Sequence, residues 1–153
     1  MDMTMGTVLV AVGSEKTEQL DRLTQTVIDI AGPAGMTVEL VHIFTKAAFD
    51  SAVERLKISD PSEASADRVA RQLTSVRDIL KRLDETDIST TVSGAVGDHA
   101  DMVVAHAKAS DADLLIVGGR RRSPAGKAVF GSTAQAIMLA APCPVTFVQS
   151  SAD

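Results

Sequence analysis

Short apolar runs rich in β-branched residues alternate along the whole chain with stretches of helical periodicity. The expected strands are Thr7 to Val12, Thr37 to Phe44, Ile88 to Ser93, Leu114 to Val117 and Val145 to Val148. Strands that are apolar on both faces are typical of parallel sheets that helices cover from both sides. The alternation therefore predicts a Rossmann-like, doubly wound α/β fold with a five-stranded parallel sheet in the order 3-2-1-4-5.

The segments between the expected strands carry helix signals of different strength. We expect Gly32-Pro33 and Gly35 to stop the first helix, whose apolar stripe is Leu20, Leu23, Val27 and Ile30. Asp60-Pro61-Ser62-Glu63 predicts the start of a second helix, whose stripe is Val69, Leu73, Val76, Leu80 and Leu83. The third helix is expected from a cap at Asp98 through Ala109. Residues Thr45 to Ser59 have no clear period and predict a long connection, such as a binding loop or lid.

Length and charge narrow the class of protein. The 153 residues fit a single domain, and the net charge of -5 with four Phe as the only aromatics argues against nucleic acid as a partner. No apolar run approaches the ~20 residues that span a bilayer, so we expect no membrane segment. The lone Cys143 cannot form an internal disulfide and is interpreted as a small buried hydrophobe. We therefore expect a cytoplasmic domain over residues 1–153.

The most informative stretch runs from Leu114 to Val148, where a strand ends in glycine and a polar loop leads to a helix that Ser132 is expected to cap. Unpaired N–H groups and the positive end of that helix favour an anion such as phosphate. Ligands of open parallel sheets lie beyond the carboxyl ends of the strands, where the winding reverses. Since the first and fourth strands end in glycine, we expect Gly13, Gly118 and Gly131 to converge on one crevice.

These residues resemble the universal stress protein family. Its signature is a glycine, two residues, a second glycine, nine residues, then glycine and serine or threonine. Here Gly118 matches the first glycine, Arg121 occupies the place of the second, and Gly131-Ser132 match the final pair. Further similar segments are VLVAV at 8–12, ELVHIF at 39–44, GDHADMVVAHAKASDADLLIVG at 97–118 and APCPVTFV at 141–148.

The resemblance implies a site for ATP or AMP, because members that bind nucleotides use the corresponding positions. It implies an adenine contact at Ile43, nucleoside contacts at Val12 and Gly13, and a floor at Val117. It further implies phosphate contacts at Gly118, Arg121, Gly131, Ser132 and Thr133.

Two departures from the family pattern leave alternatives open. Gly13 stands where nucleotide-binding members usually carry an aspartate, which removes a carboxylate able to bind ribose hydroxyls or support a metal. Arg121 replaces a glycine, so its side chain either blocks the approach of phosphate or substitutes a charged fork for it. The run Arg120 to Arg122 with Lys127 is accordingly either a solvated loop or an anion clamp. One hypothesis is a nucleotide-binding module, and the other is a homodimeric interaction module whose nucleotide site has been lost.

Other chemistry has weaker support. Gly126-Lys127-Ala128 matches a P-loop only by chance, and VGSEKTEQL after the first strand lacks the fingerprint for NAD or FAD. His99 and His106 are seven residues apart and predict no metal site, while His42 is expected to be a satisfied core histidine. No residue is a convincing catalytic base or nucleophile, so slow nucleotide hydrolysis is the third option.

The last strand suggests how the chain assembles. Residues Val145 to Gln149 are expected at a sheet edge, with apolar side chains at Val145, Phe147 and Val148. An exposed edge of this kind invites pairing with its own copy across a twofold axis. The sequence therefore predicts a homodimer through 145–149, with an unknown downstream protein partner.

Overall fold

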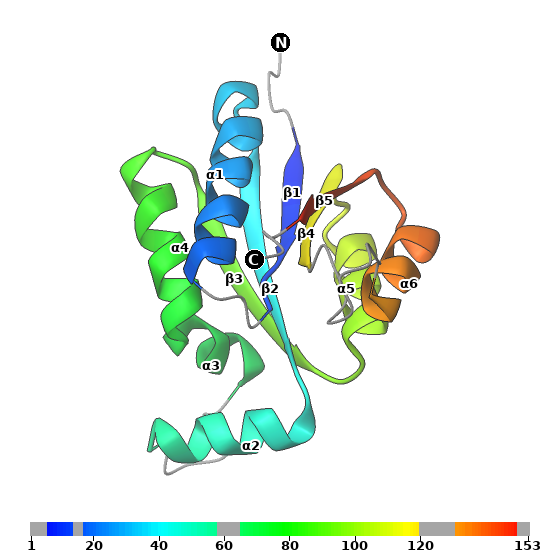
Figure 1. The fold of residues 1–153 in the computed structure, drawn as a ribbon. Helices are drawn as coiled ribbons and strands as arrows, with labels where there is room; N and C mark the ends of the chain where they lie inside the picture. The colour runs from blue at the N-terminus through cyan, green and yellow to red at the C-terminus, as the bar shows by residue number, and fades with distance from the viewer. Residues whose placement is uncertain (1–5, 14–16, 58–64, 120–130, 150–153) are drawn as a thin grey trace.

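The computed structural model describes residues 6–13, 17–57, 65–119 and 131–149 (Figure 1). Five parallel strands form one sheet in the order β3-β2-β1-β4-β5, which confirms the predicted topology. The strands are β1 (Thr7–Ala11), β2 (Thr37–Phe44), β3 (Thr90–Val96), β4 (Leu114–Gly119) and β5 (Val145–Gln149).

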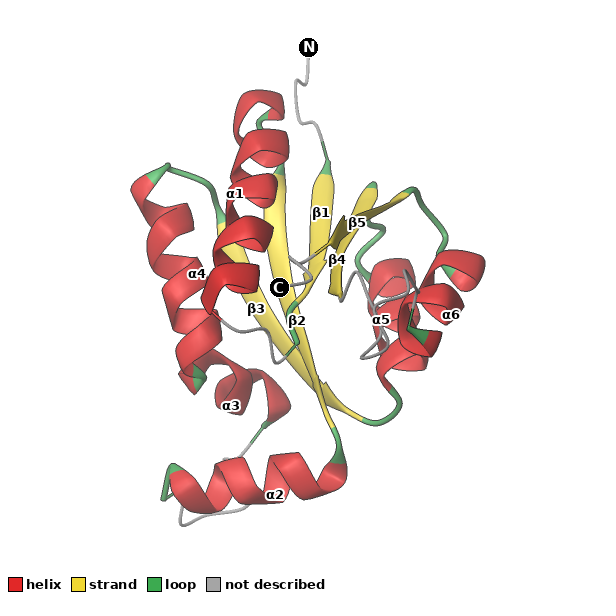
Figure 2. Cartoon of the chain, viewed as in Figure 1, coloured by secondary structure: helices red, strands yellow, loops and turns green. Residues whose placement is uncertain are grey.

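Helices cover both faces of the sheet (Figure 2). One face carries α1 (Thr17–Ala34), α3 (Ala66–Gln72) and α4 (Thr74–Glu85), and the other carries α5 (His99–Ala109) and α6 (Ser132–Ala140). The remaining helix, α2 (Lys46–Arg55), lies beyond the carboxyl end of β2 (Figure 1). This arrangement leaves the carboxyl ends of β1 and β4 between the two helical layers.

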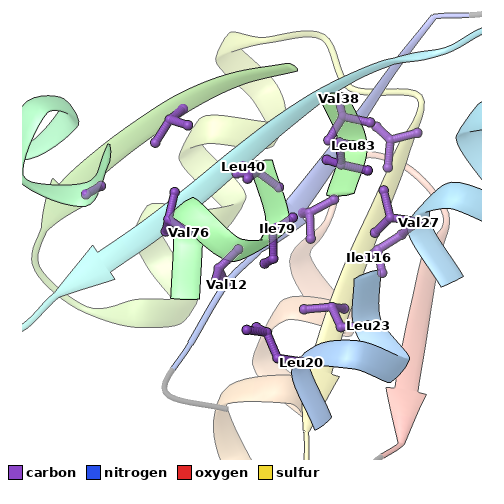
Figure 3. Packing of buried hydrophobic residues seen from close by; sticks show 14 of the residues in the cluster. Val12, Leu20, Leu23, Val27, Val38, Leu40, Val76, Ile79, Leu83 and Ile116 are labelled. Atoms are coloured by element: carbon purple, nitrogen blue, oxygen red, sulfur yellow. The ribbon is translucent and has the colours of Figure 1, made fainter. Parts of the chain in front are cut away.

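The larger of the two cores lies under α1, α3 and α4. Leu20, Leu23 and Val27 of α1 point toward the sheet, where Ile116 of β4 belongs to the same buried cluster (Figure 3). Burying a side chain of this size contributes about 1.5–3 kcal/mol relative to exposing it. The core under α5 and α6 is smaller and contains Leu9, Val41, Ile43, Leu115, Val117 and Ile137. Alternate residues of each strand therefore anchor opposite layers.

The stop of the first helix, predicted at Gly32-Pro33 and Gly35, is confirmed at Gly35 but not at Gly32-Pro33, because α1 continues to Ala34. Pro33 lies in the last turn, where it removes only one helical hydrogen bond. The helix ends instead at Gly35, whose φ of 66° suits glycine, and the N–H of Met36 bonds to the carbonyl of Ala31 at 3.0 Å.

The long connection predicted for Thr45 to Ser59 is also wrong, because most of it forms α2. The Thr45 hydroxyl accepts from the N–H of Ala48 at 3.1 Å and caps the helix. Phe49 packs edge-on against Phe44 with ring centroids 5.4 Å apart, and Ala52 is buried. Local capping and a small apolar contact thus suffice to fold this segment.

The single second helix predicted after Asp60 is two helices, because Leu73 adopts an extended conformation between α3 and α4. The predicted start at 60–63 lies outside the described residues, and Ser65 caps α3 by accepting from the N–H of Arg68 at 3.1 Å. The predicted stripe is confirmed: Val69, Val76 and Leu83 are buried, and Leu73 and Leu80 are partly buried against the same core.

The two edges of the sheet differ in cover. At Gly94 the β3 edge meets α3, where Asp67 accepts from the Gly94 N–H at 2.7 Å. A Cβ at Gly94 would collide with the backbone carbonyl of Ala66, so only glycine allows this approach. At the other edge, β5 pairs with β4 alone among the described strands.

Candidate functional site

The carboxyl ends of β1 and β4 lie side by side, as the sequence predicted. Their register pairs Ala11 with Val117. Val12 and Gly13 continue β1 beyond this pair, and Gly118 continues β4. Val12 and Val117 are buried, whereas Gly13 and Gly118 are partly exposed. The structure thus brings four of the predicted site residues to one edge of the sheet.

Val12 is attached to β2 through both of its backbone groups. Its N–H donates to the carbonyl of Val41 at 2.8 Å, and its carbonyl lies 2.7 Å from Nδ1 of His42. A carbonyl oxygen only accepts, so Nδ1 of His42 carries the proton and donates it. His42 is therefore a satisfied, part-buried histidine, as expected, but its partner is a predicted site residue.

Burial sets the protonation of His42. Desolvation lowers the pKa of the imidazole, the hydrogen bond to Val12 opposes this shift, and the nearby His99 adds a smaller lowering. The ring also packs edge-on against Phe44, with centroids 4.5 Å apart. At neutral pH the neutral, Nδ1-protonated ring is the form that fits these surroundings.

Ile43 lies where β2 extends beyond the end of β1. Backbone groups of even-numbered β2 residues face β3, because Val38 donates to Ser89 and Phe44 accepts from Gly97. Odd-numbered residues face β1, because Thr37 donates to Gly6 and Val41 accepts from Val12. The N–H and C=O of Ile43 therefore point toward the space past Val12. None of the residues that the structure describes is hydrogen-bonded to them, although Ile43 is only 2% exposed.

The amino terminus of α6 supplies a second set of backbone donors. Gly131 is the N-cap residue, and its carbonyl accepts from the N–H of Gln135 at 3.0 Å. The predicted cap at Ser132 is wrong, because the helix begins at Ser132 itself and its N-cap residue is Gly131, which has no side chain to accept a hydrogen bond. Ser132 and Thr133 are exposed, and the first N–H groups of a helix have no intrahelical acceptor. Within the part of the chain that the structure describes, no side chain is hydrogen-bonded to this positive helix end.

The remaining predicted phosphate contact, Arg121, lies outside the described residues, together with Arg120, Arg122 and Lys127. The described donors fall into two groups. One is the backbone of Ile43 on β2, and the other is the start of α6, which follows β4 in the chain. Because β1 lies between β2 and β4, these strands are about 10 Å apart.

The other candidates from the sequence make no further site. His106 bonds through Nδ1 to the carbonyl of Met102 at 3.1 Å, and no cluster of metal-ligating side chains occurs among the described residues. Cys143 is partly buried, and burial together with Asp113 raises the pKa of its thiol. None of the described helices is both long and apolar enough to cross a membrane.

Two surface grooves lie away from these donors. The larger, of about 660 Å³, is lined by residues of α3, α4 and the start of β3, including Arg71, Arg77, Lys81 and Asp84. The other lies between α1 and α4 around Arg82, which donates to Gln25 at 2.8 Å. Both are on the outside of the helical layer rather than at the carboxyl ends of the strands.

The doubly wound parallel sheet defines a Rossmann-like α/β domain, and at the carboxyl ends of its strands the backbone of Ile43 lacks a partner among the described residues. The model of the universal stress protein family matches residues 5–149, so the chain belongs to this family. A universal stress protein of Mycolicibacterium smegmatis is 28% identical over 116 residues, which cover 69% of this chain and 89% of the relative.

Solved structures of the same family share the fold. The universal stress protein from Archaeoglobus fulgidus has a TM-score of 0.64 and 23% identity, and the match covers 94% of this chain and 98% of that one. A family member from Arabidopsis thaliana with AMP bound has a TM-score of 0.63 and 15% identity, with coverage of 97% and 94%. At these identities the likeness is one of fold.

Proposed function

We propose that this universal stress protein is a cytoplasmic stress-response module that binds an adenine nucleotide, ATP or AMP, without strong catalysis of its own. The observation that carries the proposal is the backbone of Ile43 beyond the end of β1, whose N–H and C=O have no hydrogen-bond partner among the residues that the structure describes. A buried N–H and C=O without partners are unusual in folded proteins, and a ligand that satisfies them is stabilised accordingly.

The pair of backbone groups at Ile43 has the polarity that adenine requires. Adenine presents an acceptor at N1 beside a donor at its exocyclic amino group. The Ile43 N–H supplies a donor and the Ile43 carbonyl an acceptor on the same side of β2. Hypoxanthine reverses both polarities, so this backbone discriminates between the two bases.

The start of α6 is suited to the phosphate end of the same ligand. Its first residues are exposed, and their N–H groups together with the positive end of the helix dipole favour an anion. Val12, Gly13 and Val117 lie between the two ends, in the place of a nucleoside. The AMP bound to the Arabidopsis family member supports an adenine nucleotide as the ligand class.

Calorimetry with AMP, IMP and sulfate separates the two ends of the site. AMP is expected to bind, IMP to bind at least about tenfold more weakly, and sulfate to compete with the phosphate. Equal affinity for AMP and IMP would exclude base recognition by Ile43. If none of the three, nor ATP, binds at millimolar concentration, the proposal is wrong.

Two substitutions test the proposed phosphate contacts. Arg121→Glu reverses a charge and Ser132→Ala removes a hydroxyl, and both are expected to weaken AMP and ATP binding. Arg71→Glu is a matched control, because Arg71 is an exposed arginine on α3 in the groove away from the strand ends. If Arg71→Glu weakens binding as much as Arg121→Glu, the effect reflects overall charge rather than a contact.

The second candidate function is a homodimeric interaction module that does not depend on nucleotide. Gly13 at the end of β1 and Arg121 in the glycine pattern favour it, and so does the position of β5 at one edge of the sheet, where β4 is its only partner among the described strands. We propose that β5 pairs with its own copy across a twofold axis. Light scattering after size exclusion is expected to show a dimer at micromolar concentration with or without AMP, and a strict monomer would count against it.

A further inference from the structure

We infer that His42 is a positioning residue that keeps the Ile43 N–H available for a ligand. The inference concerns the free protein, and its consequence for adenine binding rests on the proposed function. It starts from the hydrogen bonds at the end of β1, where the Val12 carbonyl is bound by an imidazole rather than by the next backbone donor.

Parallel pairing predicts a different partner for the Val12 carbonyl. The Val12 N–H donates to the Val41 carbonyl at 2.8 Å, which continues the ladder between β1 and β2. In an evenly spaced parallel ladder the next bond runs from the N–H two residues further along β2, which is that of Ile43, to the Val12 carbonyl. No such bond is formed, and Nδ1 of His42 lies 2.7 Å from that carbonyl instead.

The side chain of His42 reaches this carbonyl from the face of the sheet that α1 and α4 cover. His42 shares this face with Leu40 and Phe44, while Ile43 faces α5 and α6. The imidazole thus holds the Val12 carbonyl from one face, and the β1 chain departs toward Gly13. The backbone donor of Ile43 remains directed at the space where β1 has ended.

Without the imidazole, we expect the ladder between β1 and β2 to gain the bond from the Ile43 N–H to the Val12 carbonyl. A buried carbonyl that loses its donor costs about 1–3 kcal/mol, and the Ile43 N–H is the adjacent donor in register. A side chain that cannot donate at position 42 therefore favours closure of β1 onto Ile43. The donor proposed to recognise adenine would then be consumed by the protein itself.

Two substitutions separate positioning from packing. His42→Leu keeps an apolar side chain but has no donor, whereas His42→Asn places an amide N–H where Nδ1 of the imidazole lies. Amide hydrogen exchange in the free protein is the first readout, with Val41 of the same strand as the protected reference. The Ile43 amide is expected to exchange at least about tenfold faster than that of Val41 in the wild type and in His42→Asn, and to become protected in His42→Leu.

Nitrogen chemical shifts of the His42 ring give a second readout, which is expected to show the Nδ1-protonated tautomer in the wild type. A wild-type Ile43 amide as protected as Val41, or an Nε2-protonated ring, would overturn the inference. Protection of Ile43 that is the same in wild type and His42→Leu would overturn it as well.

Affinity for AMP connects the inference to the proposed function. His42→Leu is expected to weaken AMP about tenfold, while His42→Asn stays within about threefold of the wild type. A wild type that binds no AMP would end the proposed function, and the exchange rates of Ile43 would still decide the role of His42. Equal AMP affinity in all three proteins, with binding intact, would show that the Ile43 donor is not used.

Discussion

The two ends of the central strands differ in how their backbone groups are hydrogen-bonded. At the amino end, Asp113 accepts from the Thr7 N–H at 2.9 Å and returns a backbone bond to the Thr7 carbonyl at 2.8 Å. The Thr37 N–H closes the same end on the Gly6 carbonyl at 3.1 Å. At the carboxyl end, the Ile43 backbone lacks partners among the described residues. The hydrogen bonds at the amino end thus stabilise the fold, and we propose that the polar groups at the carboxyl end bind a ligand.

Among these predictions, the largest effect is expected for Gly6→Ala, which should destabilise the fold at the amino end of the strands. Gly6 has a φ of 97°, and a Cβ there would collide with the Asp113 carboxylate. Strain and displacement of Asp113 together should lower the free energy of unfolding by about 3 kcal/mol, measured by urea titration. Gly35→Ala is the matched control, because Gly35 has a φ of 66° but no atom near its Cβ position, and should cost only about 1 kcal/mol. Equal losses would show that Asp113 does not contribute to the cost at Gly6.

Thr133→Glu is expected to weaken nucleotide binding at the carboxyl end of the strands without destabilising the fold. An acidic side chain in the first turn of α6 should stabilise the helix by about 0.3–1 kcal/mol and repel phosphate. Calorimetry should therefore show AMP binding about tenfold weaker, with an unchanged or higher melting temperature. Thr133→Gln has the same size without charge and should bind as the wild type does. Unimpaired AMP binding in Thr133→Glu would remove α6 from the site.

Asp113→Ala removes a hydrogen bond at the amino end of the strands and should lower the free energy of unfolding by less than Gly6→Ala does. The Thr7 N–H would exchange its carboxylate partner for water, because Asp113 is exposed. We expect a loss of about 1 kcal/mol in the free energy of unfolding, most of which Asp113→Asn should retain through its amide oxygen. AMP affinity should not change in either variant. If Asp113→Asn lowered the free energy of unfolding as much as Asp113→Ala, the charge of Asp113 rather than its hydrogen bond would be the source of the stabilisation.

The smallest effect concerns the pH dependence of His42. Because burial lowers the pKa of folded His42 below its ordinary 6.5, the unfolded chain binds more protons in that range. His42 should therefore contribute its full stability above pH 6.5 and lose it as the pH falls toward the lowered value. Urea titrations at pH 7.5 and 5.5 should show a larger loss in the wild type than in His42→Asn. A loss of the same size in both would assign the pH dependence to other groups.

Sequence patterns predicted the sheet because five apolar strands and their crossovers allow few parallel arrangements. They failed at helix boundaries that local interactions set. Thr45 caps α2, Leu73 interrupts the helix that was predicted as continuous, and α1 tolerates Pro33 in its last turn. The meeting of Val12, Gly13, Val117 and Gly118 followed from topology. The bond from His42 to Val12 could not be predicted, because it depends on the register of β1 and β2 and on a ring torsion. The only signal was a histidine among the apolar residues at the carboxyl end of β2.

A titration of isotopically labelled protein with AMP, followed by amide NMR, tests most directly whether the open backbone at the carboxyl end recognises adenine. The account predicts that the Ile43 amide shifts strongly downfield on binding AMP and much less on binding IMP, while Thr7 at the amino end remains unchanged. Binding of AMP that leaves the Ile43 amide unmoved would contradict it.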